Sequence, residues 1–220
     1  MKTVMTFETK AASWLVMASL TFYSCHDHDI RPIVQNDYFP LDENTSVVYQ
    51  QEFLSTGDET KTWWTDTTTL VVSGDTLIEG VVYKRIANQY GSLTKVVRQD
   101  GSKYYGRRHE AYGSFSKEYL FLDSSMPANS SWEHVKEDMG TKTEYIVKAV
   151  KAKEIVNGIE YSDVIKLEVN YYNNYVDGVS WTHLGTASHI YANGVGEIYA
   201  YYPSTVSNVF ADLRISALRE

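Results

Sequence analysis

The sequence predicts an all-β protein with a single antiparallel sheet that is curved or partly closed into a barrel. Three observations lead to this expectation: short runs of alternating apolar and polar residues, hairpin-type dipeptides between these runs, and a composition that favours strands. The chain has 18 tyrosines and only four prolines among 220 residues. Tyrosine suits a half-buried pleated surface, because its ring packs while its hydroxyl reaches water.

Tight hairpin turns are marked by Asx-Gly dipeptides. Both central residues of a two-residue hairpin turn need a positive φ, which Asn, Asp and Gly adopt most readily. The dipeptides are Asp100-Gly101, Asn157-Gly158, Asp177-Gly178 and Asn193-Gly194. We therefore expect antiparallel neighbours on either side of each turn.

The runs between the turns predict strands in both halves of the chain. They lie at 67–73, 81–87, 95–99, 103–107, 144–150, 159–169, 180–192 and 197–202, with a last strand at 209–219. Residues 143–156 could also form a helix, but the hairpin turns around them favour a strand. The alternation in 159–169 slips at Asp163-Val164, as a β-bulge would require.

Two parts of the chain resemble each other. Gly80 and Tyr83 match Gly158 and Tyr161 at the same separation of 78 residues, and residues 44–47 similarly match 129–132. We therefore expect a sheet of two meander halves, each with four or five strands. Chance similarity between hairpins is the alternative.

The N-terminus has the pattern of a signal peptide. Lys2 and Lys10 precede an apolar run of 13 residues at 11–23. A bilayer-spanning helix needs about 20 apolar residues, whereas a signal-peptide core is about 7–15 residues long. A buried N-terminal helix or strand is the alternative, but the chain turns polar directly after this run.

The only cysteine, Cys25, ends this segment in a way that resembles the lipobox of bacterial lipoproteins. Ser24 fits the small residue of that motif, whereas Phe22 and Tyr23 are bulkier than the usual residues. The resemblance implies that Cys25 becomes the lipidated first residue and that several acyl chains anchor the protein in the outer membrane. Cleavage without lipidation is the alternative.

The segment His26-Asp27-His28-Asp29 resembles the acidic tract that directs Bacteroidetes lipoproteins to the cell surface. This resemblance implies a surface location, with the periplasmic face as the alternative. We divide the chain into a signal peptide at 1–24, a lipidated cysteine with a flexible tether at 25–37, and one antiparallel β domain at 38–220.

The charge of the chain excludes some classes of partner. The net charge is −8 and becomes −9 once the two lysines and one glutamate of residues 1–24 are removed. Nucleic-acid binding needs a basic footprint, so we expect no nucleic-acid partner. With Cys25 used by the anchor, no disulfide can form within the chain.

Several short motifs resemble a broad group of uncharacterised Bacteroidetes outer-membrane and surface lipoproteins. They are Asn36-Asp37-Tyr38-Phe39-Pro40-Leu41, Val48-Tyr49, the Gly80–Tyr83 spacing, and the entry to a late strand at Tyr191-Ala192-Asn193-Gly194-Val195-Gly196-Glu197-Ile198. The Gly and Trp that often precede the equivalent of Tyr49 are absent here. The resemblance implies an antiparallel β domain at the outer membrane, and it implies no catalytic residue.

Aromatic residues carry the binding hypothesis. Neighbouring strand residues point to opposite faces, so adjacent aromatic pairs offer one ring to the core and one outward, where sugars could stack. The alternative is that these rings build the core. The candidate ligand-binding residues are Trp63, Trp64, Tyr104, Tyr171 and Tyr175.

Two threonines are candidates for O-glycosylation. Thr67 and Thr76 each follow an aspartate, in the Asp-Thr pattern that Bacteroidetes use on exported proteins.

No sequence motif indicates a particular reaction, metal site or cofactor. No His-Glu-x-x-His sequence occurs, and His183 and His189 would lie about 20 Å apart on one extended strand. We therefore expect a non-enzymatic envelope lipoprotein, bound to the membrane by its lipid, that recognises a glycan or an envelope protein or serves a structural role. A carrier of an apolar ligand in a concave sheet is the alternative, and a hydrolase using an acid pair such as Glu137 and Asp138 is the third hypothesis.

Overall fold

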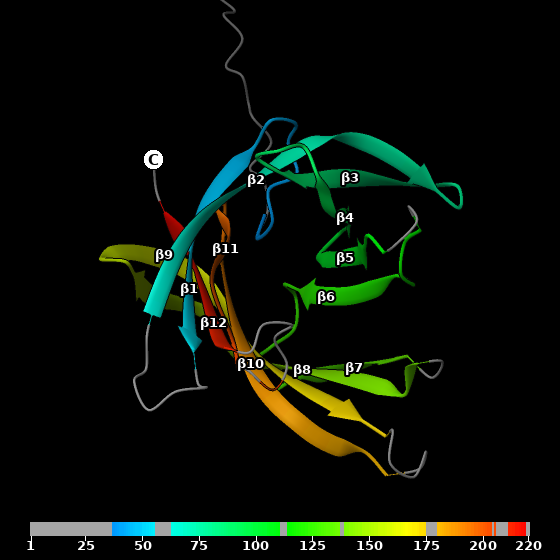
Figure 1. Cartoon of the computed structure of the whole chain (residues 1–220), viewed down its shortest axis with the longest axis vertical. Coiled ribbons are helices and arrows are strands. Elements are labelled where there is room, and N and C mark those ends of the chain that lie inside the picture. The colour runs from blue at the N-terminus through cyan, green and yellow to red at the C-terminus, as the bar shows by residue number, and fades with distance from the viewer. Residues whose placement is uncertain are drawn as a thin grey trace, which may run out of the picture. The chain divides into compact units, whose positions relative to one another are not determined.

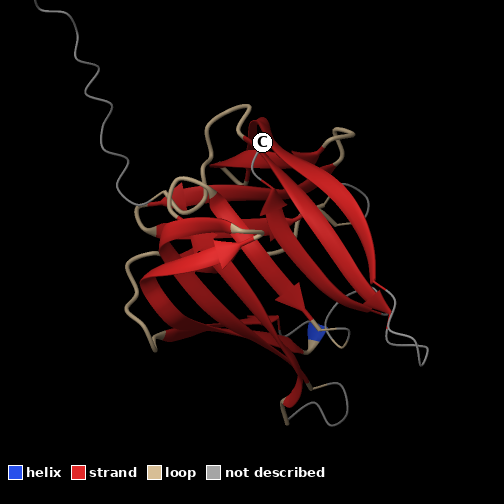
Figure 2. Ribbon diagram, turned by 90° about the vertical axis from the view of Figure 1, so that its left-hand side faces the viewer, coloured by secondary structure: helices blue, strands red, loops and turns tan. Residues whose placement is uncertain are grey.

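The computed structural model describes residues 37–55, 63–110, 114–136, 139–174, 180–203, 205 and 211–218. These residues belong to one compact unit that comprises residues 36–220. They form twelve antiparallel strands (Figures 1 and 2). The strands are β1 (Ser46–Ser55), β2 (Trp63–Ile78), β3 (Val81–Asn88), β4 (Leu93–Asp100), β5 (Lys103–Arg108), β6 (Tyr119–Asp123), β7 (Ser131–Lys136), β8 (Thr141–Val156), β9 (Ile159–Asn173), β10 (Thr182–Ala192), β11 (Gly196–Tyr202) and β12 (Ala211–Leu218).

All twelve strands belong to one sheet that is nearly closed into a barrel. Its order is β6-β5-β4-β3-β2-β1-β12-β11-β10-β9-β8-β7, so each half of the chain is a six-stranded meander, and β1 pairs with β12 to join them. At the open seam, Trp132 Nε1 of β7 donates a hydrogen bond to the Leu120 carbonyl oxygen of β6 at 3.0 Å. The predicted fold class is confirmed.

Nine of these strands coincide with runs predicted from the sequence, although β2, β8 and β9 are longer than predicted. Residues 143–156 are strand and not helix. β1, β6 and β7 were not predicted from the sequence, and each half has six strands where four or five were expected. The turn predicted at Asp177-Gly178 lies outside the described residues.

The predicted repeat between the halves is present in the backbone. Glu79 and Asn157, which open the two matched turns, have φ of 53° and 52°. Asn44 and Asn129 have φ of 68° and 69°. The backbone amide of each of these asparagines donates to the second strand of its half, at the carbonyl of Val72 or Val147, and the amides of those two residues donate back to the residue after the asparagine.

The turn ends of two long hairpins form an outer layer on the sheet. In the second half, Tyr161, Ile198 and Ala217 belong to one cluster of buried side chains, and Asn157 Nδ2 donates to Ser216 Oγ at 3.0 Å. The predicted bulge lets the hairpin bend over the sheet, because Asp163 has a φ of 53° and the β8–β9 register shifts beside it.

The first half repeats this outer layer around Tyr83, which is 1% exposed. The Tyr83 hydroxyl donates to Glu118 and accepts a hydrogen bond from Arg107 Nε at 3.1 Å. Glu118 also accepts from Arg98 Nε at 2.6 Å and from Arg98 Nη2 at 2.8 Å. The matched tyrosines of the sequence repeat are therefore structural anchors of the two hairpins.

The main core fills the barrel interior, and residues 37–41 contribute to it. Tyr38 and Phe39 are buried in this core. The Asp37 carbonyl accepts a hydrogen bond from the Gly194 amide at 2.6 Å. A Cβ added at Gly196 would lie 3.5 Å from Pro40 Cδ, and the φ of +102° at this position strongly favours glycine. The Tyr-Phe-Pro and Gly-Val-Gly motifs noted in the sequence thus meet in space.

Candidate functional site

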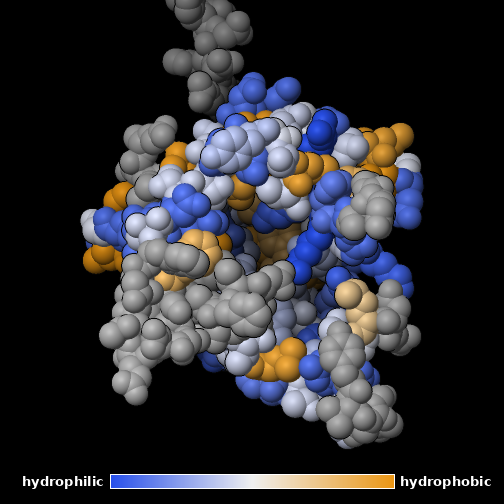
Figure 3. All heavy atoms as spheres, viewed as in Figure 1, coloured by the Kyte–Doolittle hydropathy of each residue, from blue (hydrophilic) through white to orange (hydrophobic). Residues whose placement is uncertain are grey.

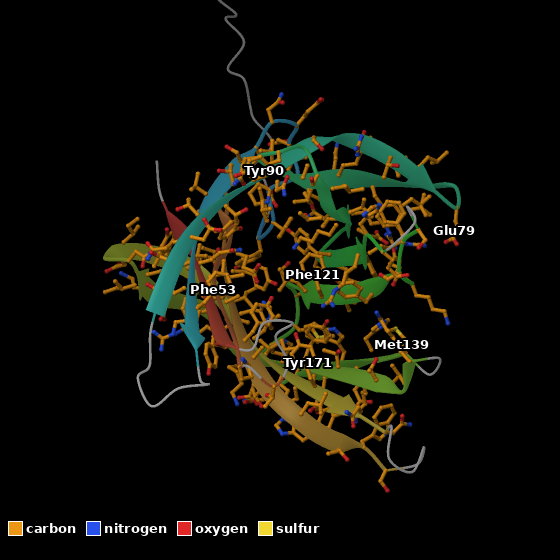
Figure 4. All side chains as sticks on the ribbon, in the orientation of Figure 1. Phe53, Glu79, Tyr90, Phe121, Met139 and Tyr171 are labelled. Carbon is orange, nitrogen blue, oxygen red and sulfur yellow. The ribbon has the colours of Figure 1, made fainter. Side chains whose placement is uncertain are left out.

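A polar cavity lies inside the barrel where strands of both halves converge. Its volume is about 70 Å³, and it is lined by side chains from β4, β5, β6, β8, β9, β10 and β11. Figure 3 shows a hollow at the centre of the face of the molecule that is turned toward the viewer. In Figure 4, Phe121 and Tyr171 lie inside the curve of the sheet, whereas Tyr90 lies at its rim. The lining residues are Lys95, Arg108, Tyr119, Phe121, Tyr145, Leu167, Val169, Tyr171, His189, Tyr191, Glu197 and Tyr202.

Two cations stand on one side of this cavity. Lys95 of β4 and Arg108 of β5 are directly opposite each other in the strand ladder, and both line the cavity. The Lys95 ammonium lies 4.9 Å from the centroid of the Phe39 ring and 5.6 Å from that of Phe121. Lys95 is half-buried and Arg108 is exposed, so both can be reached from solvent.

A histidine–carboxylate pair stands on the opposite half. His189 Nδ1 lies 2.6 Å from Glu197 Oε1, and the two side chains are only 11% and 15% exposed. Burial alone would raise the pKa of the Glu197 carboxyl, but hydrogen bonds and charge from His189, with contributions from Lys95 and Tyr191, lower that pKa below its ordinary value. Glu197 is therefore an ionised carboxylate in the barrel interior.

Tyrosine hydroxyls complete the lining. Burial raises the pKa of Tyr171 to about 12, and it raises the pKa values of Tyr191 and Tyr202 well above that of an ordinary phenol. These tyrosines are therefore neutral near pH 7, and each hydroxyl can donate or accept a hydrogen bond. The His189 ring stacks parallel to Tyr191 at 6.3 Å and meets Tyr202 edge-on at 5.1 Å.

The aromatic residues predicted to bind a ligand at the surface lie in different places. Tyr104 is 0% exposed, so its ring lies in the core and not at the surface, and its hydroxyl accepts a hydrogen bond from the Tyr38 amide. Tyr171 is half-buried and turned into the cavity. Trp63 and Trp64 belong to β2, but their side chains, like the whole of Tyr175, lie outside the described residues.

The remaining predicted sites are modification sites. Thr67 is exposed and Thr76 is half-buried, both on β2, so O-glycosylation at these positions stays a prediction. Cys25, its signal peptide and the segment His26–Asp29 lie outside the described residues, and lipidation stays a prediction as well.

The charged residues of the cavity were not predicted as site residues from the sequence. Lys95 shares a face of β4 with Leu93 and Val97, and Arg108 shares a face of β5 with the buried Tyr104 and Gly106. A full charge on the apolar face of an alternating strand is the signal that could have revealed them. His189 had been considered only for a metal site shared with His183.

Metal-ligating and membrane-spanning features can be assessed only in the described ranges. Within them, no group of three or more His, Cys, Asp or Glu residues is arranged to hold a metal ion. Across the same ranges, no helix has the length and apolarity that crossing a membrane requires.

Comparison with known proteins gives similarity in structure only. No family model matches the chain, and no curated protein matches it. A "putative lipoprotein" from Parabacteroides distasonis is similar in structure, with a TM-score of 0.43 and 11% identity over 83% of this chain and 97% of that one.

A "putative exported protein with YmcC-like fold" from Bacteroides fragilis has a TM-score of 0.40 and 12% identity over 84% of this chain and 98% of that one. The chain is similar to both at low identity.

Proposed function

We propose that this chain is a non-enzymatic binding lipoprotein of the cell envelope and that its ligand binds inside the barrel. The observation that carries this proposal is the polar cavity, in which two cations, a buried histidine–carboxylate pair and five tyrosines converge from both halves. Taking a carboxylate out of water costs several kcal/mol even after relaxation. A core that served only stability would be better filled by apolar side chains.

The lining favours a polar ligand. Tyrosine rings offer faces for stacking, and their hydroxyls with the charged groups offer hydrogen bonds. This moves the expected glycan or envelope-component site from the outer surface to the barrel interior. An apolar ligand suits the site less well, since the apolar cavity beside Phe39 and Ile86 has a volume of only about 30 Å³.

A hydrolase finds less support in this cavity. Glycosidases use a pair of carboxyl groups on either side of the scissile bond. Among the described lining residues, Glu197 is the only acid, and its carboxylate is engaged by His189.

The binding proposal can be tested with a glycan array on the purified chain. We expect Tyr171→Ala to lose the binding that the wild type shows, while Tyr90→Ala, at a ring that is 83% exposed, keeps it. Near-UV circular dichroism would establish that both variants are folded. Loss of binding in Trp63→Ala and Trp64→Ala with full binding by Tyr171→Ala would return the site to the outer surface. If neither the wild type nor any variant binds a glycan on the array, a glycan is excluded as the ligand.

The envelope location is a separate part of the proposal. It depends on Cys25 as a lipidated residue that anchors the chain in the outer membrane, at the cell surface or on the periplasmic face. Mass spectrometry of the N-terminal peptide from the native envelope tests it, and an unmodified Cys25 or an uncleaved start would exclude the anchor. The intact mass of the same material tests O-glycosylation at Thr67 and Thr76.

A further inference from the structure

We propose that the cavity binds an oxyanion head group, a carboxylate, sulfate or phosphate, between Lys95 and Arg108. This inference rests on the proposed binding function and names the chemistry of its ligand. It starts from the β4–β5 register, which puts the two cations on directly opposed positions and turns both into the cavity.

Opposed like charges are an unfavourable choice for a sheet. Side chains directly opposite each other in an antiparallel pair have Cβ atoms about 4.5–5.5 Å apart, and like charges at such positions are destabilising. An anion between them would turn this repulsion into two attractions. Arginine in particular offers donors in a planar fork that matches oxyanions bidentately.

The protein does not supply that anion from the residues that the structure describes. Several other cations of the sheet have a carboxylate partner; Arg98 pairs with Glu118, and Lys166 pairs with Glu154. No described carboxylate lies within 4.0 Å of Lys95 or Arg108.

The described neighbours of the two cations are aromatic. Lys95 lies over the rings of Phe39 and Phe121, and Arg108 lines the cavity together with Tyr119. Glu197 interacts with Lys95 only through space, because its close partner is His189.

The size and access of the cavity fit a head group better than a whole ligand. A volume of about 70 Å³ has room for on the order of five water-sized groups, since one water needs at least about 10–15 Å³. Arg108 is exposed and Lys95 half-buried, so the rest of a ligand would extend out of the cavity. Tyr171, protonated because its pKa is about 12, can donate to the same anion.

The net charge of the whole chain further restricts the class of ligand. The net charge is −8, so a long polyanion would be repelled by the rest of the molecule. A ligand with one local anionic group avoids this repulsion. The ligand class is therefore a small molecule or saccharide end that carries one oxyanion, such as an acidic sugar.

The test is isothermal titration of the purified chain with sodium sulfate, sodium phosphate and sodium glucuronate, with glucose as the neutral comparison, all at constant ionic strength. We expect saturable binding of at least one oxyanion. We expect Lys95→Met and Arg108→Met to weaken it at least tenfold, Arg108→Lys to retain part of it, and Lys103→Met, at an exposed position of the same strand, to leave it unchanged. Near-UV circular dichroism checks that each variant is folded.

The outcomes separate this inference from the proposed function. Tighter binding of glucuronate than of the inorganic anions would support the acidic-sugar ligand, and tighter binding of sulfate or phosphate would support the site with an inorganic or esterified anion. The inference is overturned if no oxyanion binds, or if Lys95→Met and Arg108→Met bind the oxyanion as tightly as the wild type does. If a neutral glycan still binds in a Tyr171-dependent way, the proposed function stands without it. If neither class of ligand binds, both fail.

Discussion

Replacing Tyr104 by phenylalanine should loosen the start of the domain. The Tyr104 hydroxyl accepts hydrogen bonds from the buried Tyr38 amide at 3.0 Å and from Gln99 Nε2 at 3.2 Å, and it lies 3.5 Å from Asp37 Oδ1. Tyr38 is only 3% exposed, so its amide has no access to bulk water. Tyr104→Phe removes the acceptor and leaves the ring in place.

The expected cost follows from these partners. A buried amide left without an acceptor costs about 1–3 kcal/mol. Gln99 is exposed and regains water, so it adds little. We expect a loss of about 2 kcal/mol in the free energy of unfolding, which lowers the thermal midpoint by about 4–8 °C in a domain of this size.

The assay is urea unfolding followed by circular dichroism, with hydrogen exchange at the Tyr38 amide as the local readout. Tyr90→Phe is the control, because Tyr90 is 83% exposed and should change stability by less than about 0.5 kcal/mol. Unchanged stability in Tyr104→Phe, together with unchanged exchange at the Tyr38 amide, would refute the assignment of Tyr104 as the clamp of this segment.

Three further predictions test other parts of the fold. Burial, together with the charge of nearby cations, lowers the pKa of His134 in the folded state below its value in the unfolded chain. The free energy of unfolding should therefore be greatest above about pH 6.5 and should decline below that pH. Urea unfolding should show a weaker decline in His134→Gln, and identical profiles would contradict this. Gly106→Ala should cost about 1–3 kcal/mol, because the new Cβ would lie 3.2 Å from Tyr119 Cζ; unchanged urea unfolding would mean that the ring moves freely. Asn157→Ala should cost about 1–2 kcal/mol, because Asn157 has a φ of 52° and donates to Ser216; an unchanged thermal midpoint would contradict it.

The strands that sequence reasoning found and missed differ in how their burial alternates. Residues 159–169 alternate and directly follow the Asn157-Gly158 turn, which is why β9 was predicted. In β7 the partly buried side chains are Trp132, His134 and Lys136, while Val135 is exposed, so hydropathy gives the opposite pattern. In β6 the last three residues are all buried, which leaves no alternation to recognise.

The candidate site was less predictable than the fold, because register creates it. Lys95 and Arg108 lie on different strands, and only the β4–β5 pairing makes them neighbours. His189 and Glu197 flank a turn, and the register shift in the β10–β11 pairing accompanies their approach. Tyr171 was predicted as a binding residue, but its direction into the barrel depends on the closure of the sheet.

The two repeated halves differ in the charges that they present to the cavity, and this difference gives the electric field across the cavity a direction. Lys95 and Arg108 belong to the fourth and fifth strands of the first meander, and His189 and Glu197 belong to the fourth and fifth strands of the second. Two identical halves would place the same charges on both sides of the barrel interior. Here one half presents two cations and the other a histidine–carboxylate pair, so the field across the cavity has a direction. A ligand with one anionic end would therefore enter in a single orientation, with that end at β4 and β5.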